Sequence, residues 1–340
     1  MNVDKDYVLT LAETLIGIDS PIGFTNTAMA KVEELTGELG LKAVRSSAGA
    51  VQVHFPGKDE STFSNICSSI GTMGLMVRSI TESGRLNIVE LGNRVCSILV
   101  GEYCRIYTRE GEIFTGTVVS KNPIKHFIAD ANSWSRKAIN MEICIDEIVH
   151  SKSDVLKLGI STGDFICIDP KFEVTPAGFI KSRFLNDKLS VAILFGFVKY
   201  LVDNRITPIH NLKFIFSNYD KMGHSTAWLP ERESELIAVG SGCVGDDSNC
   251  SEYDVSICAA YSGRPYDYNI ISRLVGLAQE NSINYTVDVY HMSDVCEARR
   301  AEYDIAAAVI GPGVSASHNI ERCHYQAVEA TIRLLAAYFE

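Results

Sequence analysis

The sequence lacks the short signatures by which many enzymes and zinc proteins are recognised. Its ten cysteines include no Cys-x-x-Cys pair, which excludes the usual thiolate zinc signature. It also has no His-Glu-x-x-His, Gly-x-Ser-x-Gly, Gly-x-Gly-x-x-Gly or Walker motif. Several cysteines lie in apolar runs, which is typical of buried free thiols that act as small hydrophobic residues. The function therefore has to be judged from longer segments.

Positive charge is scarce. The chain has 31 Lys plus Arg against 42 Asp plus Glu, a net charge of −11, and no Lys/Arg run. This balance argues against nucleic acid or an anionic membrane as the main partner. Long apolar runs are absent too, since Leu189–Val198 is far below the ~20 residues that span a bilayer. The first twenty residues lack the basic region and uninterrupted apolar core of a signal peptide. We therefore expect a cytoplasmic protein.

Hydrophobic residues make up 46% of the chain and charged residues 21%, which is globular composition. Periodicity predicts helices over residues 5–18 and 27–39 and a strand over 50–55. From about 72 to 165 we find short β-like runs between glycines and no convincing amphipathic helix. Helix and strand then alternate up to a closing helix over Ile320–Tyr338. This pattern predicts an α/β domain from residues 1–71 and 165–340, with a small all-β, barrel-like domain inserted over 72–164.

Two groups of polar residues follow buried strand candidates, where α/β enzymes place function. His318 comes shortly after the run Ile305–Ile310, and could be a ligand, a base or a hydrogen-bonded loop histidine. Asp220 and Lys221 follow Leu212–Ser217, and fit either an acid/base carboxylate beside a cation or a solvated turn.

Two further groups carry weaker signals. Asp246 and Asp247 could bind a hard cation, although such pairs are common in polar turns. His291 and Asp294 are spaced as a conceivable metal pair, but a polar loop explains them as well. Taken alone, these residues justify only an α/β protein with polar loops at its strand ends.

Five segments together give the chain a resemblance to the tetrahedral and glutamyl aminopeptidases, which are cytosolic dinuclear metallopeptidases once also labelled endoglucanases. The resemblance covers nearly the whole chain in order. It implies a three-layer, phosphorylase/hydrolase-like α/β domain with a β insert, and commonly a dodecamer built from dimers. The segments that carry it are 18–23, 74–77, 111–126, 158–164 and 181–188.

The family's functional residues, carried over one at a time, mostly meet other residue types here. The resemblance places four metal-ligand positions on residues without a suitable anionic or imidazole group: Ser69, Asn186, Lys221 and Gly240. The general-base position is Asp220, which is one methylene shorter than the family's glutamate. Only the last ligand, His318, keeps its residue. A shift of one residue would put Asp187 on the bridging position, but Gly74, Leu185 and Gly223 argue against it.

Grouped by metal, these positions leave too few ligands. One ion would be held by Ser69, Asn186 and Gly240, and the other by Asn186, Lys221 and His318. Zinc catalysis normally needs about three protein ligands of the His, Cys, Asp or Glu type. An ammonium group ~4 Å from another unit positive charge is repelled by about 4 kcal/mol at an effective dielectric constant of ~20. We therefore expect no metal cofactor, although rescue by Asp246, Asp247, His291 or Asp294 stays open.

Three functions compete. The first is a non-catalytic or chemically altered family member that binds small peptides, or has a structural or regulatory role in a homo-oligomer. The second is an active metallo-aminopeptidase that uses zinc or cobalt, with Asp220 as its base. The third is a glycosidase, which needs two acids flanking the sugar bond, and no such pair is evident. We favour the first.

Overall fold

The computed structural model describes residues 1, 3–92, 98–121, 135–219, 233–261, 264–289 and 305–340. The chain divides into two compact units. The first consists of residues 1–18, 25–71 and 171–340, and the second of residues 19–24 and 72–170.

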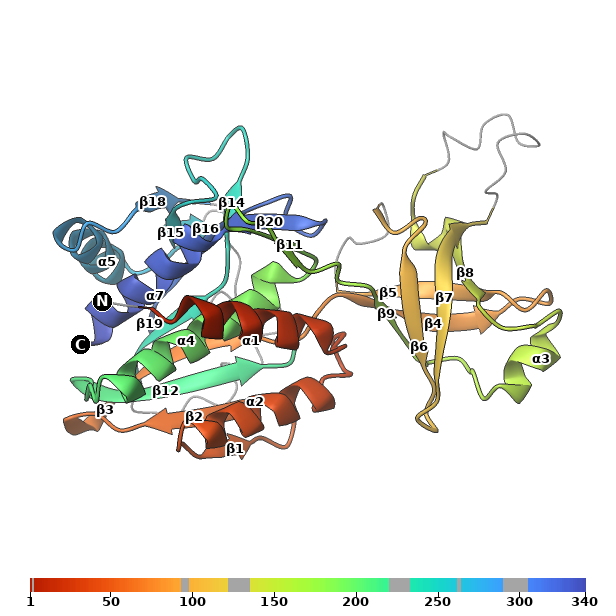
Figure 1. The fold of residues 1–340 in the computed structure, drawn as a ribbon, viewed down its shortest axis with the longest axis horizontal. Coiled ribbons are helices and arrows are strands. Elements are labelled where there is room, and N and C mark those ends of the chain that lie inside the picture. The colour runs from red at the N-terminus through yellow and green to blue at the C-terminus, as the bar shows by residue number, and fades with distance from the viewer. Residues whose placement is uncertain (2, 93–97, 122–134, 220–232, 262–263, 290–304) are drawn as a thin grey trace. The chain divides into compact units, whose positions relative to one another are not determined.

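A mixed sheet forms the centre of the first unit (Figure 1). Its middle is parallel, in the order β12 (His210–Ser217), β3 (Asp59–Ser69), β13 (Glu233–Val239) and β19 (Ala306–Ser315). One side ends in the antiparallel strands β2 (Val51–Phe55) and β1 (Ala43–Arg45). The other side continues through β20 (Glu321–His324), β11 (Phe179–Ser182) and β10 (Glu173–Val174). Short strands also join near β19, namely β14 (Gly242–Val244), β15 (Val255–Cys258) and β18 (Tyr285–Asp288). A separate hairpin pairs β16 (Ala260–Tyr261) with β17 (Arg264–Pro265).

Helices pack on this sheet and complete its main core. They are α1 (Lys5–Gly17), α2 (Asn26–Glu38), α4 (Ser190–Asp203), α5 (Tyr268–Glu280) and α7 (Tyr325–Phe339). Helix α4 lies beside both α1 and α7 (Figure 1). Its Phe195 ring stacks on Phe216 of β12 with the centroids 5.2 Å apart, and both side chains are buried. Burial of such large apolar side chains is the main force that holds α4 on the sheet.

The second unit is a closed barrel in the order β4 (Gly74–Ile80), β5 (Leu86–Leu91), β8 (Met141–Ile145), β7 (Ile113–Ser120), β6 (Tyr103–Tyr107) and β9 (Phe165–Ile168). Alternating side chains such as Leu75 and Val77 on β4 face a separate apolar core. A 3₁₀ turn, η2 (Ala138–Asn140), and a short helix, α3 (Lys152–Lys157), complete the unit. The predicted α/β fold with an all-β insert is confirmed.

The units divide the chain differently from the predicted boundaries. Strand β9 pairs with both β4 and β6, so the barrel unit continues to Pro170 and does not end at residue 164. Residues 19–24 also belong to it, because Arg105 binds Asp19 at 2.6 Å and Phe24 stacks on Phe165. Both contacts join residues far apart in sequence, which periodicity does not detect.

One helix prediction was wrong at its start. The segment predicted as one helix over Ile320–Tyr338 begins with the strand β20, and α7 starts only at Tyr325. Nδ1 of His324 accepts a hydrogen bond from the Gln326 N–H and so caps the helix. In the region 72–165, where we find no convincing amphipathic helix in the sequence, Ser151 caps the short, six-residue α3. Among the described residues, no helix is long and apolar enough to cross a membrane.

Candidate functional site

The parallel strands β3 and β12 end side by side at Ser69 and Ser217. These two residues are register partners, and the Ile70 N–H donates to the Ser217 carbonyl at 2.9 Å. The carboxyl ends of parallel strands are where open α/β sheets bind ligands. Ser69, on which the resemblance places a ligand position, therefore lies at the expected edge of the sheet.

Asn186 lies in a π-helical turn, η3 (Leu185–Leu189), that precedes α4. The turn follows Phe184, whose φ of 68° is in the left-handed region that non-glycine residues seldom adopt. The Ser241 hydroxyl donates to Asn186 Oδ1 at 2.9 Å. The Ser190 hydroxyl contacts both the Asn186 carbonyl, at 2.7 Å, and the Gly240 carbonyl, at 3.0 Å. The structure thus brings together two predicted positions, Asn186 and Gly240.

Glu321 on β20 joins this cluster to the last predicted residue. Its side chain is 1% exposed. One carboxylate oxygen accepts the Asn186 N–H at 3.1 Å, and the other accepts the His318 N–H at 2.9 Å. His318 itself has a φ of 64°. Sequence reasoning missed Glu321, and its position three residues after His318 was the only signal that could have found it.

Four other candidates, Asp220, Lys221, His291 and Asp294, are outside the described residues. Asp246 and Asp247 are exposed in the turn after β14. No group of three or more metal-ligating side chains gathers anywhere in the described part of the chain.

The donors that the described residues offer do not fit a two-metal centre. Asn186 Oδ1 already accepts the Ser241 hydroxyl, and Gly240 has no side chain. Both oxygens of Glu321 already accept backbone N–H groups. A zinc site built from three or four strong ligands therefore has too few in this set, in which His318 is the one imidazole.

A fully buried lysine supports the π-helical turn. Lys188 is 0% exposed, and its ammonium group donates to the Leu15 carbonyl at 2.7 Å and to the Ile18 carbonyl. These carbonyls belong to the last turn of α1 and its C-cap, where a cation also interacts favourably with the helix dipole. Lys188 thereby ties the turn that carries Asn186 to the end of α1.

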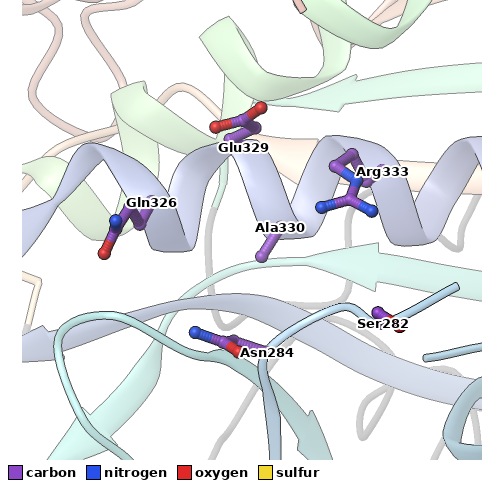
Figure 2. A pocket seen from close by; sticks show the side chains of 6 residues that line it. All are labelled: Ser282, Asn284, Gln326, Glu329, Ala330 and Arg333. Carbon is purple, nitrogen blue, oxygen red and sulfur yellow. The ribbon is translucent and has the colours of Figure 1, made fainter. Parts of the chain in front are cut away.

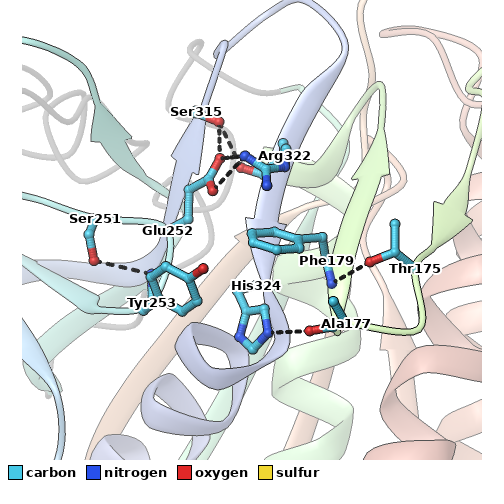
Figure 3. Close-up of polar contacts among 9 residues, drawn as sticks. All are labelled: Thr175, Ala177, Phe179, Ser251, Glu252, Tyr253, Ser315, Arg322 and His324. Carbon is cyan, nitrogen blue, oxygen red and sulfur yellow. Dashed lines mark hydrogen bonds and ion pairs between the residues drawn. The ribbon is translucent and has the colours of Figure 1, made fainter.

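Strand β20 is held from its other face by a polar and aromatic network (Figure 3). Arg322 lies over the Phe179 ring at 3.8 Å and pairs with Glu252 at 2.9 Å. The Ser315 hydroxyl also donates to Glu252. The His324 Nε2 contacts the Ala177 carbonyl at 2.8 Å. Because side chains alternate along a strand, these outward contacts hold Glu321 in its inward position.

A polar pocket of about 200 Å³ lies beside α7 (Figure 2). Its lining residues are Ser282, Asn284, Gln326, Glu329, Ala330 and Arg333. Arg333 donates to the carbonyl of Asn281, the C-cap residue of α5, at 2.9 Å. This hydrogen bond therefore helps to hold the C-terminal end of α5. The described residues that line the pocket include none of the predicted site residues.

The eight described cysteines are free thiols, as predicted. Burial raises the pKa of the Cys104 and Cys250 thiols to about 12 each. A thiol with a pKa that high is almost entirely protonated at neutral pH, and only the thiolate is nucleophilic. These two cysteines are therefore inert core residues.

A family model of M42 glutamyl aminopeptidases matches residues 49–334. The chain belongs to the M42 glutamyl aminopeptidase family. It is 36% identical over 335 residues to the Bacillus subtilis (strain 168) protein YhfE, a candidate aminopeptidase by its name, and the match covers 98% of this chain and 97% of YhfE.

Solved structures of two peptidases share the fold. The TET aminopeptidase of the marine sediment archaeon Thaumarchaeota archaeon SCGC AB-539-E09 has a TM-score of 0.88 at 17% identity, over 98% of this chain and 96% of that one. The TET1 peptidase of Pyrococcus horikoshii has a TM-score of 0.84 at 17% identity, over 98% of this chain and 99% of that one.

Proposed function

We propose that this M42 homologue lacks the two-metal centre of its family, does not hydrolyse peptides, and instead binds small peptides. The observation that carries the proposal is Asn186. The resemblance places it where the family has a bridging carboxylate, so a neutral carboxamide stands there, and its oxygen accepts the Ser241 hydroxyl. A bridging ligand without negative charge cannot offset the charge of two divalent ions.

The neighbouring positions support the same conclusion. Ser69 and Gly240 offer no strong ligand for the first ion. In the sequence, Lys221 places an ammonium group at a ligand position of the second ion, where it would repel a cation. The alternative, an active metallo-aminopeptidase with zinc or cobalt, would require these positions to be replaced by ligands from elsewhere.

Metal quantification and hydrolysis together test the proposal. The purified protein would be incubated with Zn²⁺, Co²⁺ or Mn²⁺, desalted and analysed by mass spectrometry for metal, and then assayed with aminoacyl-anilides. We expect neither stoichiometric metal nor release of the anilide. Two bound ions per chain, together with hydrolysis that is lost in Asp220→Ala, would establish the active enzyme instead.

We further propose that the protein is a cytoplasmic homo-oligomer. The Pyrococcus TET1 peptidase, which has the same fold, can assemble into a tetrahedron or a large octahedral shell. The free state of the eight described cysteines supports a reducing compartment, since thiols in oxidising compartments usually pair.

A further inference from the structure

The pocket beside α7 forms around one small residue. Gln326, Ala330 and Arg333 are spaced i, i+4 and i+7, so they share one face of the helix. Ala330 is 6% exposed and lies between the two long side chains (Figure 2). Because alanine carries only a methyl group, this face of α7 leaves a hollow of about 200 Å³ at its position.

The wall opposite α7 is a segment whose backbone is fixed. It follows α5, and Ser282 has a φ of 50°, the left-handed conformation that commonly ends a helix. Ile283 is 4% exposed, and its N–H donates to the Ala278 carbonyl at 2.9 Å. The Asn284 carbonyl accepts the Val255 N–H at 3.1 Å. Buried Ile283 thus holds the residues on either side of it at the pocket.

Two opposite charges line the pocket and stay apart. Glu329 and Arg333 are four residues apart on α7, which is the spacing of a helical ion pair. They form no ion pair with each other, since Arg333 donates to the Asn281 carbonyl at 2.9 Å, and Glu329 has no ion-pair partner in the described part of the chain. A guanidinium group has five N–H donors, so most of those on Arg333 are left for a ligand.

Three neutral polar side chains complete the lining, namely Ser282, Asn284 and Gln326. Within the described ranges, none of these side chains hydrogen-bonds another residue. A carboxamide or a hydroxyl can both donate and accept, so all three can serve either end of a charged ligand. Figure 2 shows them, with the two charged side chains, in a ring around Ala330.

We propose that this pocket binds a free α-amino acid as its zwitterion. The ammonium group pairs with Glu329, and the carboxylate pairs with Arg333, whose planar fork suits it. A simple anion would be repelled by Glu329 and a simple cation by Arg333, while an uncharged ligand would leave both charges unpaired.

The size of the pocket favours a single small molecule. Its volume of about 200 Å³ is below the roughly 300–1,000 Å³ of pockets that take drug-sized ligands. The inference goes beyond the proposed function and does not depend on it, because the pocket contains none of the positions assigned to the metal centre.

Calorimetric titration of the full chain with L-alanine at pH 7 tests the site. We expect L-alanine to bind. N-acetyl-L-alanine, which lacks the ammonium group, and L-alaninamide, which lacks the carboxylate, should bind at least about tenfold more weakly, since each loses charge-assisted hydrogen bonds.

Variants of the pocket place the ligand. Glu329→Gln and Arg333→Gln each remove one charge and should weaken L-alanine binding at least about tenfold. Ala330→Leu fills the hollow with a good helix former, keeps both charges and should abolish binding. Because Glu329→Gln and Ala330→Leu keep the contact of Arg333 with Asn281, the test stands even if Arg333→Gln fails to fold.

Arg45→Gln is the matched control. Arg45 pairs with Glu33 at 2.8 Å and does not line the pocket, so its loss should leave L-alanine binding unchanged. The inference is overturned if the wild type does not bind L-alanine, if either blocked derivative binds as tightly, or if Glu329→Gln and Ala330→Leu bind L-alanine as the wild type does.

Discussion

At the residue scale, Glu321 is the side chain on which the geometry of the cluster depends most. Its two carboxylate oxygens hold the backbones of Asn186 and His318, which are 132 positions apart in the chain. Both N–H groups come from irregular backbone, a π-helical turn and a left-handed residue, that needs such support. Loss of this anion should therefore release both residues at once.

Glu321→Gln tests that role. A carboxamide has one oxygen, so one of the two N–H groups would face an NH₂ group and lose its acceptor. Since hydrogen bonds to buried charged groups contribute about 1.5–3 kcal/mol, we expect the free energy of unfolding to fall by about 2 kcal/mol. Urea titration followed by circular dichroism measures it.

Glu329→Gln, on the surface of α7, provides the control. We expect this variant to stay within about 0.5 kcal/mol of the wild type, as surface substitutions usually do. Equal stability of the two variants would show that Glu321 does not support the cluster.

At the scale of elements, the π-helical turn and the end of α1 form one joined unit through Lys188. Lys188→Met keeps the length of the side chain but leaves the Leu15 and Ile18 carbonyls without this donor. The Leu15 carbonyl keeps the Ile18 N–H, but the Ile18 carbonyl loses its lysine donor. We expect a loss of about 2 kcal/mol in the free energy of unfolding, since an unsatisfied buried polar group costs about 1–3 kcal/mol.

Chemical denaturation gives the free energy of unfolding of Lys188→Met and of the control variant Lys31→Met. Lys31 pairs with Glu34 on the surface of α2 at 2.7 Å, and such pairs contribute about 0–1 kcal/mol. If Lys188→Met were no less stable than Lys31→Met, the proposed tie between the turn and α1 would be wrong.

The stability of the barrel unit should depend on pH through Asp154 of helix α3. Hydrogen bonds from Ser151, Lys157 and the His150 N–H lower the pKa of Asp154 to about 2. Because the folded pKa is below the ordinary value of about 3.9, the stabilisation is present above pH ~4 and is lost as the pH falls toward ~2. Asp154→Asn should thus be less stable than the wild type at pH 6, and the difference should shrink below pH 4. Unfolding curves at pH 2.5–6 decide this, and a difference independent of pH would contradict it.

At the scale of the whole molecule, the prediction concerns assembly. We expect light scattering after size-exclusion chromatography to give the mass of two or more chains, each of 37.4 kDa. This prediction follows from the proposed homo-oligomer, since most soluble oligomers are closed, symmetric assemblies of identical chains. A monomer at micromolar concentration would contradict the inherited assembly.

Much of the architecture could be predicted from the sequence because it repeats locally. The helix over residues 5–18 and the strands of the barrel follow from apolar periods of 3.6 and 2 residues. Strand β20 could not be found this way, since its four residues are a strand only because β11 and β19 pair with them. The same holds for β9, whose apolar run was evident but whose place in the barrel depends on β4 and β6.

The sequence by itself determined the family resemblance and which residue types occupy the family's ligand positions, because identities at aligned positions need no coordinates. Only the tertiary structure decided what those residues do together. It brought Asn186, Gly240 and His318 to one place, added Glu321, and left the Ser69 and Ser217 hydroxyls adjacent and unpaired. Hydrogen bonds and burial depend on side chains that meet across strands distant in sequence, so no local pattern could have specified them.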